Sequence, residues 1–101
     1  MPKQDADASP EFKIFETDEF LKKLAKLPAS DARPIRAKLD DYLCPQLRQE
    51  PFFGPNIKKL KGYTPDTWRY RIGRFRLFYG IETEERTVVI LTLDLRRDAY
   101  R

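Results

Sequence analysis

The sequence predicts an α+β domain: an N-terminal strand, a helical hairpin and then a three-stranded antiparallel meander, with the helices packed on one face of the sheet. Apolar residues between positions 17 and 47 recur at helical spacing, whereas those from position 68 onward alternate with a period of two. Gly73-Arg74 suits a two-residue hairpin turn between two alternating segments. The chain has 101 residues, 41% of them hydrophobic, which is enough for one domain with a modest core.

The first structured element is expected to follow a polar tail. Residues 1–10 are rich in aspartate and alanine, so we expect a flexible tail before a single domain that covers 11–101. Residues 12–15 alternate as a short strand does. Thr17 or Asp18 then caps a helix that stops at Pro28. The expected apolar stripe of this helix consists of Phe20, Leu21, Leu24 and Leu27.

A second helix is predicted to begin at Ser30 or Asp31, and Pro34 falls early enough in it to be tolerated. Pro45 is expected to end or kink this helix near Cys44, although Leu47 can extend the packing face. The two helices are therefore expected to form an antiparallel hairpin. The apolar face of the second helix consists of Ile35, Leu39, Tyr42 and Leu43.

The second half of the chain changes from helical to strand periodicity. Residues 51–66 contain proline, glycine, asparagine and three lysines, which predicts a long loop. Strands are predicted over 68–72, 75–82 and 86–95, with a second, slightly longer turn at 83–85. The loop is expected to be anchored by Phe52, Phe53, Ile57 and Leu60.

The composition argues against several classes of protein. The chain has no histidine, which argues against a zinc site or a Ser–His triad, and its single cysteine cannot form an internal disulfide. No apolar run approaches the roughly eighteen residues of a membrane span, so no membrane association is expected. The first residues lack the apolar core of a signal peptide. We therefore expect a cytoplasmic protein without a metal or other cofactor.

Positive charge is concentrated in the second half of the chain. Residues 1–50 carry nine Lys/Arg against ten Asp/Glu, and residues 51–101 carry eleven against six. Eight of the eleven arginines lie between positions 69 and 101. A basic surface on one part of a small domain indicates an anionic partner, although a charge total alone favours a solvated surface, so the positions of the charges must decide.

The register of the predicted hairpin brings arginines together. With a turn at Gly73-Arg74, Arg71 lies directly opposite Arg76, and Arg69 lies opposite Phe78. Like charges directly opposite in a sheet destabilise it by a few tenths to about 1 kcal/mol. A phosphodiester would relieve that repulsion, because the guanidinium fork matches phosphate oxygens. The alternative is that each arginine pairs with a carboxylate or extends into water.

A further basic cluster follows the last predicted strand, and it contains a tyrosine. It lies beside the arginine-bearing hairpin if strand order follows sequence order. In a chain without histidine, Tyr100 is the best candidate to donate or accept a proton near a phosphate. Its alternative role is to pack the final turn. The charged members of this cluster are Arg96, Arg97 and Arg101.

These motifs together resemble the RelE/ParE superfamily of bacterial and archaeal type II toxins. The resemblance rests on the lysine-rich segment before the hairpin, a G-x-x-R-x-x-Y pattern at Gly73, Arg76 and Tyr79, and a closing R-x-D-x-Y-R element. It covers roughly residues 12–101. It implies a RelE-like fold, with a helical hairpin on an antiparallel sheet. In the RelE-like branch it further implies metal-independent mRNA cleavage in the ribosomal A site.

The resemblance also implies roles for individual residues and a protein partner. Arg76 and Arg96 would stabilise the scissile phosphate, while Arg69 and Arg71 match catalytic positions where the family places basic substrate-orienting or base-like residues. Tyr100 would position the nucleotide or take part in proton transfer. The partners implied are the ribosome with its mRNA and a cognate antitoxin. Contacts to RNA and the ribosome would come from Lys58, Lys59, Lys61, Arg74 and Arg97.

One departure from the family pattern keeps other functions open. Many relatives carry histidine, and others lysine, where this chain has Leu95, and leucine can move no proton. The activity is therefore expected to be weak. The alternatives are a gyrase inhibitor of the ParE type and a catalytically weak relative that binds RNA or an antitoxin.

Overall fold

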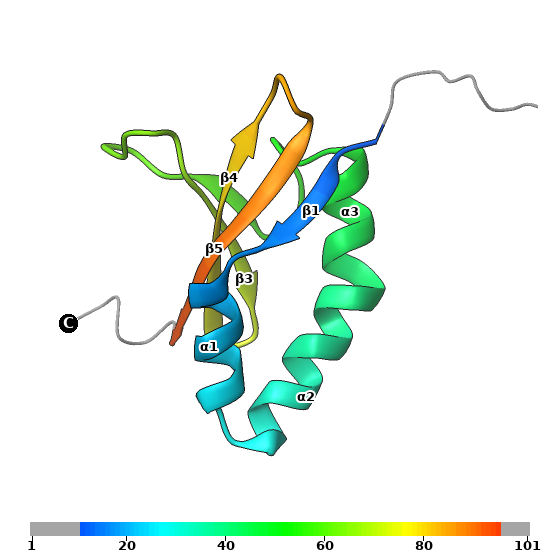
Figure 1. Ribbon diagram of the computed structural model, residues 1–101, viewed down its shortest axis with the longest axis vertical. Coiled ribbons are helices and arrows are strands. Elements are labelled where there is room, and N and C mark those ends of the chain that lie inside the picture. The colour runs from blue at the N-terminus through cyan, green and yellow to red at the C-terminus, as the bar shows by residue number, and fades with distance from the viewer. Residues whose placement is uncertain (1–10, 96–101) are drawn as a thin grey trace, which may run out of the picture.

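The computed structural model describes residues 11–95, and its order of elements agrees with the predicted α+β class. The chain runs through one strand, four consecutive helical elements and four further strands, and the ribbon in Figure 1 can be followed in this order. The tail predicted for residues 1–10 lies outside the described residues. The elements are β1 (Lys13–Glu16), α1 (Asp18–Lys26), α2 (Ala29–Lys38), the π-helical turn η1 (Leu39–Leu43), α3 (Cys44–Gln49), β2 (Ile57–Lys59), β3 (Trp68–Ile72), β4 (Phe75–Glu82) and β5 (Thr87–Leu95).

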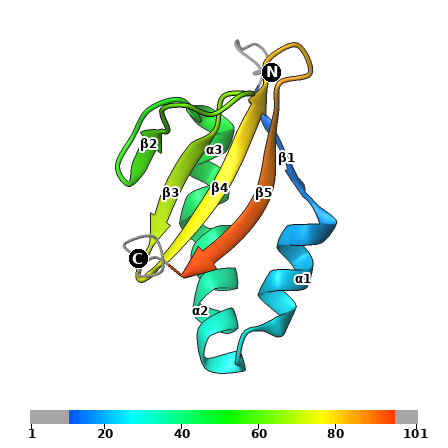
Figure 2. The ribbon, with the colours of Figure 1, turned by 90° about the vertical axis from the view of Figure 1, so that its left-hand side faces the viewer.

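The five strands form one mixed sheet in the order β1-β5-β4-β3-β2. The meander β3-β4-β5 is antiparallel as predicted, whereas β1 pairs with β5 in parallel. The segment α2–η1–α3 runs along one face of the sheet (Figure 1), and Figure 2 looks onto the opposite face. We call that opposite face the outer face.

The fifth strand, β2, corrects the prediction of an unbroken loop over residues 51–66. Ile57–Lys59 pairs antiparallel with the edge of β3, with Ile57 opposite Tyr70. Asn56 precedes this strand with a φ of 69°, and its carbonyl accepts a hydrogen bond from the Arg71 N–H at 3.0 Å. The strand is only three residues long, so the neighbouring proline and glycine residues conceal it in the sequence.

Helix α1 begins where its cap predicts. The Thr17 side chain accepts a hydrogen bond from the Phe20 N–H at 3.2 Å, and the helix ends just before Pro28. The expected apolar stripe is only partly correct. Phe20 and Leu24 are buried, but Leu21 is 41% exposed because α1 packs along the edge of the sheet and contributes a narrow face to the core.

The second helix differs from the prediction at both prolines. It begins at Ala29, with Pro28 as its N-cap, so neither Ser30 nor Asp31 caps it. Pro34 consequently lies inside the helix, beyond the first turn.

Pro45 does not end the helical segment. Instead, the backbone widens into the π-helical turn η1, and the Cys44 N–H donates to the Leu39 carbonyl. Proline lacks an N–H and its ring collides with the carbonyl four residues earlier in an α-helix, so a wider turn accommodates it. Helix α3 then continues past Pro45 and buries Leu47.

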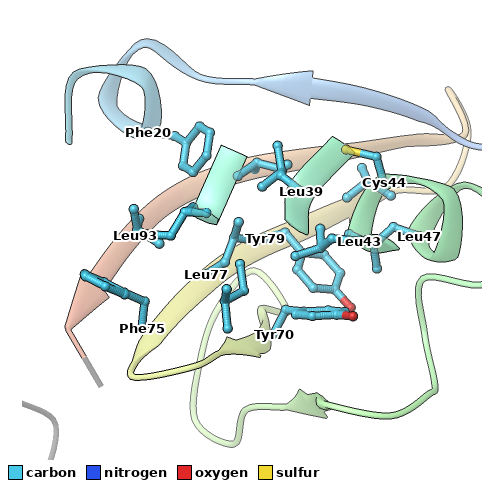
Figure 3. Packing of buried hydrophobic residues seen from close by; sticks show 14 of the residues in the cluster. Phe20, Leu39, Leu43, Cys44, Leu47, Tyr70, Phe75, Leu77, Tyr79 and Leu93 are labelled. Carbon is cyan, nitrogen blue, oxygen red and sulfur yellow. The ribbon is translucent and has the colours of Figure 1, made fainter. Parts of the chain in front are cut away.

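The core lies between the sheet and the long helical segment (Figure 3). Alternate residues of β3 and β4 point toward the helices, as the period of two predicts, and they meet buried side chains of α1, η1 and α3. Phe52 packs edge-on against Trp68, whereas Phe53, an expected loop anchor, is 78% exposed. The buried sheet residues include Trp68, Tyr70, Ile72, Phe75, Leu77, Tyr79, Val88, Ile90 and Leu93.

Tyr79 predicts how stability depends on alkaline pH. Its ring is fully buried and its hydroxyl donates to the Pro51 carbonyl at 2.7 Å, and this burial raises the pKa of Tyr79 far above its usual value. Its contribution to stability is therefore complete below the unfolded-state pKa of about 10 and is lost as the pH rises above it. Tyr79→Phe is expected to destabilise the fold by about 1–2 kcal/mol at pH 8.

Above about pH 10 the difference in the free energy of unfolding between wild type and Tyr79→Phe is expected to narrow by up to about 1.4 kcal/mol per pH unit. Only the wild type loses stability there, because phenylalanine cannot ionise. Urea denaturation at a series of pH values measures this. Tyr63→Phe, at a side chain that is 53% exposed, serves as the matched control. A gap that stays constant up to pH 11 would contradict the buried position of the Tyr79 hydroxyl.

Within residues 11–95, no helix combines the length and the apolar character needed to cross a membrane.

Candidate nucleic-acid interface

The β3–β4 hairpin has the register that its sequence predicts. Arg71 is paired with Arg76, and Arg69 is paired with Phe78. Gly73 has a φ of 56°, as the first residue of a two-residue turn of this kind requires. Because residues paired across a sheet point to the same side, these arginines lie on the outer face, opposite the buried residues of the same strands.

Strand β2 adds a fourth cation to this face. Lys58 is paired with Arg69, so its side chain points to the outer face as well. Lys58, Arg69, Arg71 and Arg76 form what we call the basic cluster, which spans three neighbouring strands seen in Figure 2. Lys58 and Arg71 are exposed, and Arg69 and Arg76 are half-buried. The cluster therefore combines two side chains that extend into solvent with two that the surrounding residues hold in place.

A β-bulge between β4 and β5 determines which residues of β5 lie beside the basic cluster. The register shifts at Phe78/Tyr79, so that Thr92 lies opposite Phe78 and Asp94 lies opposite Arg76. Asp94 accepts a hydrogen bond from Lys23 of α1 at 3.1 Å. The carboxylate nearest in register to Arg76 is thus also engaged by a cation from the N-terminal half of the chain. The face consequently keeps an excess of positive charge, which suits a phosphate backbone.

Three other predicted contact residues lie away from the basic cluster. Lys59 is paired with Trp68, and its ammonium group contacts Asp66 at 3.3 Å. Arg74 contacts Asp31 of α2 at 3.0 Å. Lys61 is exposed in the turn after β2. These side chains are available for general attraction of RNA, but their position does not bring them to the same phosphate as Arg76.

The remaining predicted site residues are Arg96, Arg97 and Tyr100, and they lie outside the described residues. Tyr79, the tyrosine of the G-x-x-R-x-x-Y pattern, is a core residue whose hydroxyl binds a backbone carbonyl. Within residues 11–95, no group of three or more histidine, cysteine, aspartate or glutamate side chains could hold a metal ion. The lysine and arginines of the basic cluster can bind and polarise a phosphate through their positive charge.

Sequence reasoning did not place two cations on the outer face. Lys58 was predicted to contact RNA from within a loop, and its position beside Arg69 depends on the short pairing of β2 with β3. Lys23 comes from a different element and reaches Asp94 across 71 positions of sequence. The only local signal for Lys58 is that it follows the apolar Ile57, as alternation along a strand would have it. The local sequence gives no signal that Lys23 reaches Asp94.

Comparison with known proteins gives a consistent match. The family model described as the ParE toxin of type II toxin–antitoxin systems matches residues 14–100. RelE1 of Methanocaldococcus jannaschii is 31% identical over 81 residues, which are 80% of this chain and 86% of that protein.

Solved structures share the fold. In the RelBE2 toxin–antitoxin complex of Mycobacterium tuberculosis, the matching chain is 29% identical with a TM-score of 0.67, covering 85% of this chain and 99% of that one. In the archaeal RelE–RelB complex of Pyrococcus horikoshii, the match is 24% identical with a TM-score of 0.63, covering 85% and 96%.

Proposed function

Because the chain belongs to the RelE/ParE superfamily of type II toxin–antitoxin toxins, we propose that it is a ribosome-dependent endoribonuclease that cleaves mRNA and so inhibits translation. The observation that carries this proposal is the basic cluster. Lys58, Arg69, Arg71 and Arg76 share one face, and Asp94 is the carboxylate in register with Arg76, so the cations are in excess. An excess of fixed positive charge suits the phosphodiester backbone of mRNA.

The proposed reaction is a metal-independent transfer at phosphorus. The ribose 2′-oxygen forms a bond to the adjacent phosphorus as it loses its proton, and the bond from phosphorus to the 5′-oxygen breaks as that oxygen gains a proton. The products are a cyclic phosphate and a 5′-hydroxyl. Negative charge grows on the non-bridging oxygens in the transition state, so fixed guanidinium groups accelerate the reaction.

The basic cluster fits the electrostatic part of this reaction. Arg76 is half-buried in the middle of the sheet and is proposed to contact the non-bridging oxygens, together with Arg96. Arg69 and Arg71 are proposed to orient the neighbouring phosphates. Arginine stays protonated in proteins, so these groups stabilise charge and do not carry the proton. Tyr100 is proposed to take part in proton transfer.

Leu95 bears on how active the enzyme is. Its backbone pairs with Phe75, and its side chain packs against the core, on the helix side of the sheet. Leucine at this position therefore does not remove a group from the outer face. Because the chain has no histidine, proton transfer in the proposed reaction depends on Tyr100, so we expect slow cleavage.

A cognate antitoxin is proposed as the protein partner. The solved toxin–antitoxin complexes that this chain resembles support it. The antitoxin segment that covers the basic cluster is expected to be acidic and amphipathic, because it lies on a positively charged face of the sheet.

Inhibition of DNA gyrase is the second candidate, because the matching family model is that of the ParE toxin. Supercoiling assays with purified gyrase test it. A ParE-like toxin would block supercoiling and leave mRNA intact on the ribosome.

The proposed function is tested by incubating the full chain with a defined mRNA on programmed ribosomes and mapping the ends by primer extension. We expect cuts within the A-site codon that require the ribosome and leave a cyclic phosphate and a 5′-hydroxyl. Intact mRNA together with inhibited supercoiling would reject the endoribonuclease in favour of the gyrase inhibitor.

A further inference from the structure

A hollow of about 480 Å³ lies at the edge of β3, between this strand and the long helical segment, and Arg71 is the member of the basic cluster that lines it. Lys38 and Tyr42 line it from the helical side, and Asn56 and Arg71 line it from the sheet side. Two cations and an exposed aromatic ring from distant parts of the chain therefore border one space.

Tyr42 is placed there by an unusual backbone feature. It lies in the π-helical turn η1, and its side chain is 67% exposed although the expected packing face of the helix includes it. The Lys38 ammonium group lies 5.9 Å from the centre of its ring. Single π-helical turns are frequent at functional sites. An exposed tyrosine beside a lysine presents a flat face for stacking and a charge for a phosphate at the same point.

The base of the hollow is held by hydrogen bonds. The Gln46 side chain accepts from the Tyr70 hydroxyl at 2.7 Å and donates to the Pro55 carbonyl at 3.3 Å. The carbonyl of Asn56 accepts from the Arg71 N–H at 3.0 Å. Bonds among three chain segments thus hold the Gln46 side chain and the Asn56 backbone in place, which lowers the entropic cost of binding a small planar ligand.

Arg71 connects this hollow with the basic cluster. It belongs to the cluster through its pairing with Arg76, and it also lines the hollow. Strand β2 pairs with β3 only as far as Tyr70, so the edge of β3 beyond that residue is not covered by β2. A polyanionic strand lying on the outer face can therefore turn around this edge and continue into the hollow.

We infer that the hollow binds one nucleotide of single-stranded RNA, with its base stacked on Tyr42 and its phosphate between Lys38 and Arg71. The inference deepens the proposed function, on which it rests, by naming a second point of contact for the RNA next to the scissile phosphate. The aromatic ring favours RNA over an acidic peptide, because a peptide would use the two cations and leave the ring without a planar partner.

Direct binding tests the inference without the ribosome and without cleavage. The full chain is titrated with a short fluorescent single-stranded RNA that carries 2′-O-methyl groups, and anisotropy gives the dissociation constant at several salt concentrations. Tyr42→Ala is expected to weaken binding about 5- to 100-fold, the range of one lost base stack, and Tyr42→Phe is expected to retain it. Lys38→Gln is expected to weaken binding and reduce the salt slope by about 0.7.

Two matched variants control for general effects. Tyr63→Ala removes another exposed tyrosine, and Lys22→Gln removes another exposed lysine, both outside the hollow. Equal losses for Tyr42→Ala and Tyr63→Ala, or no binding of the RNA by the wild-type chain, would overturn the inference. An unchanged RNA affinity in Tyr42→Ala with weakened binding of an acidic peptide would assign the hollow to a protein partner instead.

The cleavage assay separates this inference from the proposed function. RNA binding that depends on Tyr42 in a chain that cuts no mRNA would support the hollow and reject the endoribonuclease. Cleavage with a KM that Tyr42→Ala leaves unchanged would support the endoribonuclease and reject the hollow as part of its RNA path.

Discussion

Replacing Arg76 with alanine is expected to reduce mRNA cleavage on programmed ribosomes by about 100- to 1,000-fold, the effect of removing one fixed donor from a developing oxyanion. Arg76 is half-buried in β4, and Arg71 and Asp94 lie opposite it on either side. Its guanidinium is therefore held near the centre of the basic cluster. Arg76→Lys keeps the charge but loses the planar fork, so an intermediate loss is expected.

The matched control for Arg76 is Lys59→Ala. Lys59 is 56% exposed, pairs with Asp66 and lies off the outer face, so its loss is expected to lower only the general affinity for RNA. Single-turnover cleavage rates at saturating ribosome concentration separate the two effects. Equal losses for Arg76→Ala and Lys59→Ala would mean that Arg76 contributes only general attraction. Unchanged unfolding midpoints would show that both variants remain folded.

The largest expected effect on stability comes from Leu77→Ala, which should lower the free energy of unfolding by about 3–4 kcal/mol. Leu77 is fully buried in the middle of β4, opposite Tyr70 on one side and Leu93 on the other (Figure 3). Neighbouring strands hold its surroundings in place, so the cavity cannot collapse easily. For a domain of this size that loss is a large part of the total, which is typically about 5–15 kcal/mol.

Leu91→Ala is the matched control, because Leu91 lies at the β-bulge and is 37% exposed. Urea denaturation should show a strongly lowered midpoint for Leu77→Ala, with an unchanged slope, and a small shift for Leu91→Ala. Similar midpoints for the two variants would contradict the assignment of Leu77 to the centre of the core.

The local sequence predicts those structural features that depend on residues within one helix, one strand or one turn. Alternation along β3 and β4, together with the glycine at position 73, predicts the register that places Arg71 opposite Arg76. The Thr17 cap predicts the start of α1. In each case, spacing along a single strand or helix determines which way a side chain points. The three arginines of the basic cluster were accessible by this route.

Features that depend on contacts between distant segments were decided only by the tertiary structure. The three residues of β2 become a strand because the edge of β3 accepts them, and this brings Lys58 to the outer face. Pro45 is accommodated by a π-helical turn, which leaves Tyr42 beside the β3 edge instead of in the core. Lys23 reaches Asp94 because α1 lies along the end of β5. Periodicity specifies the face of an element, but only packing specifies which neighbour meets that face.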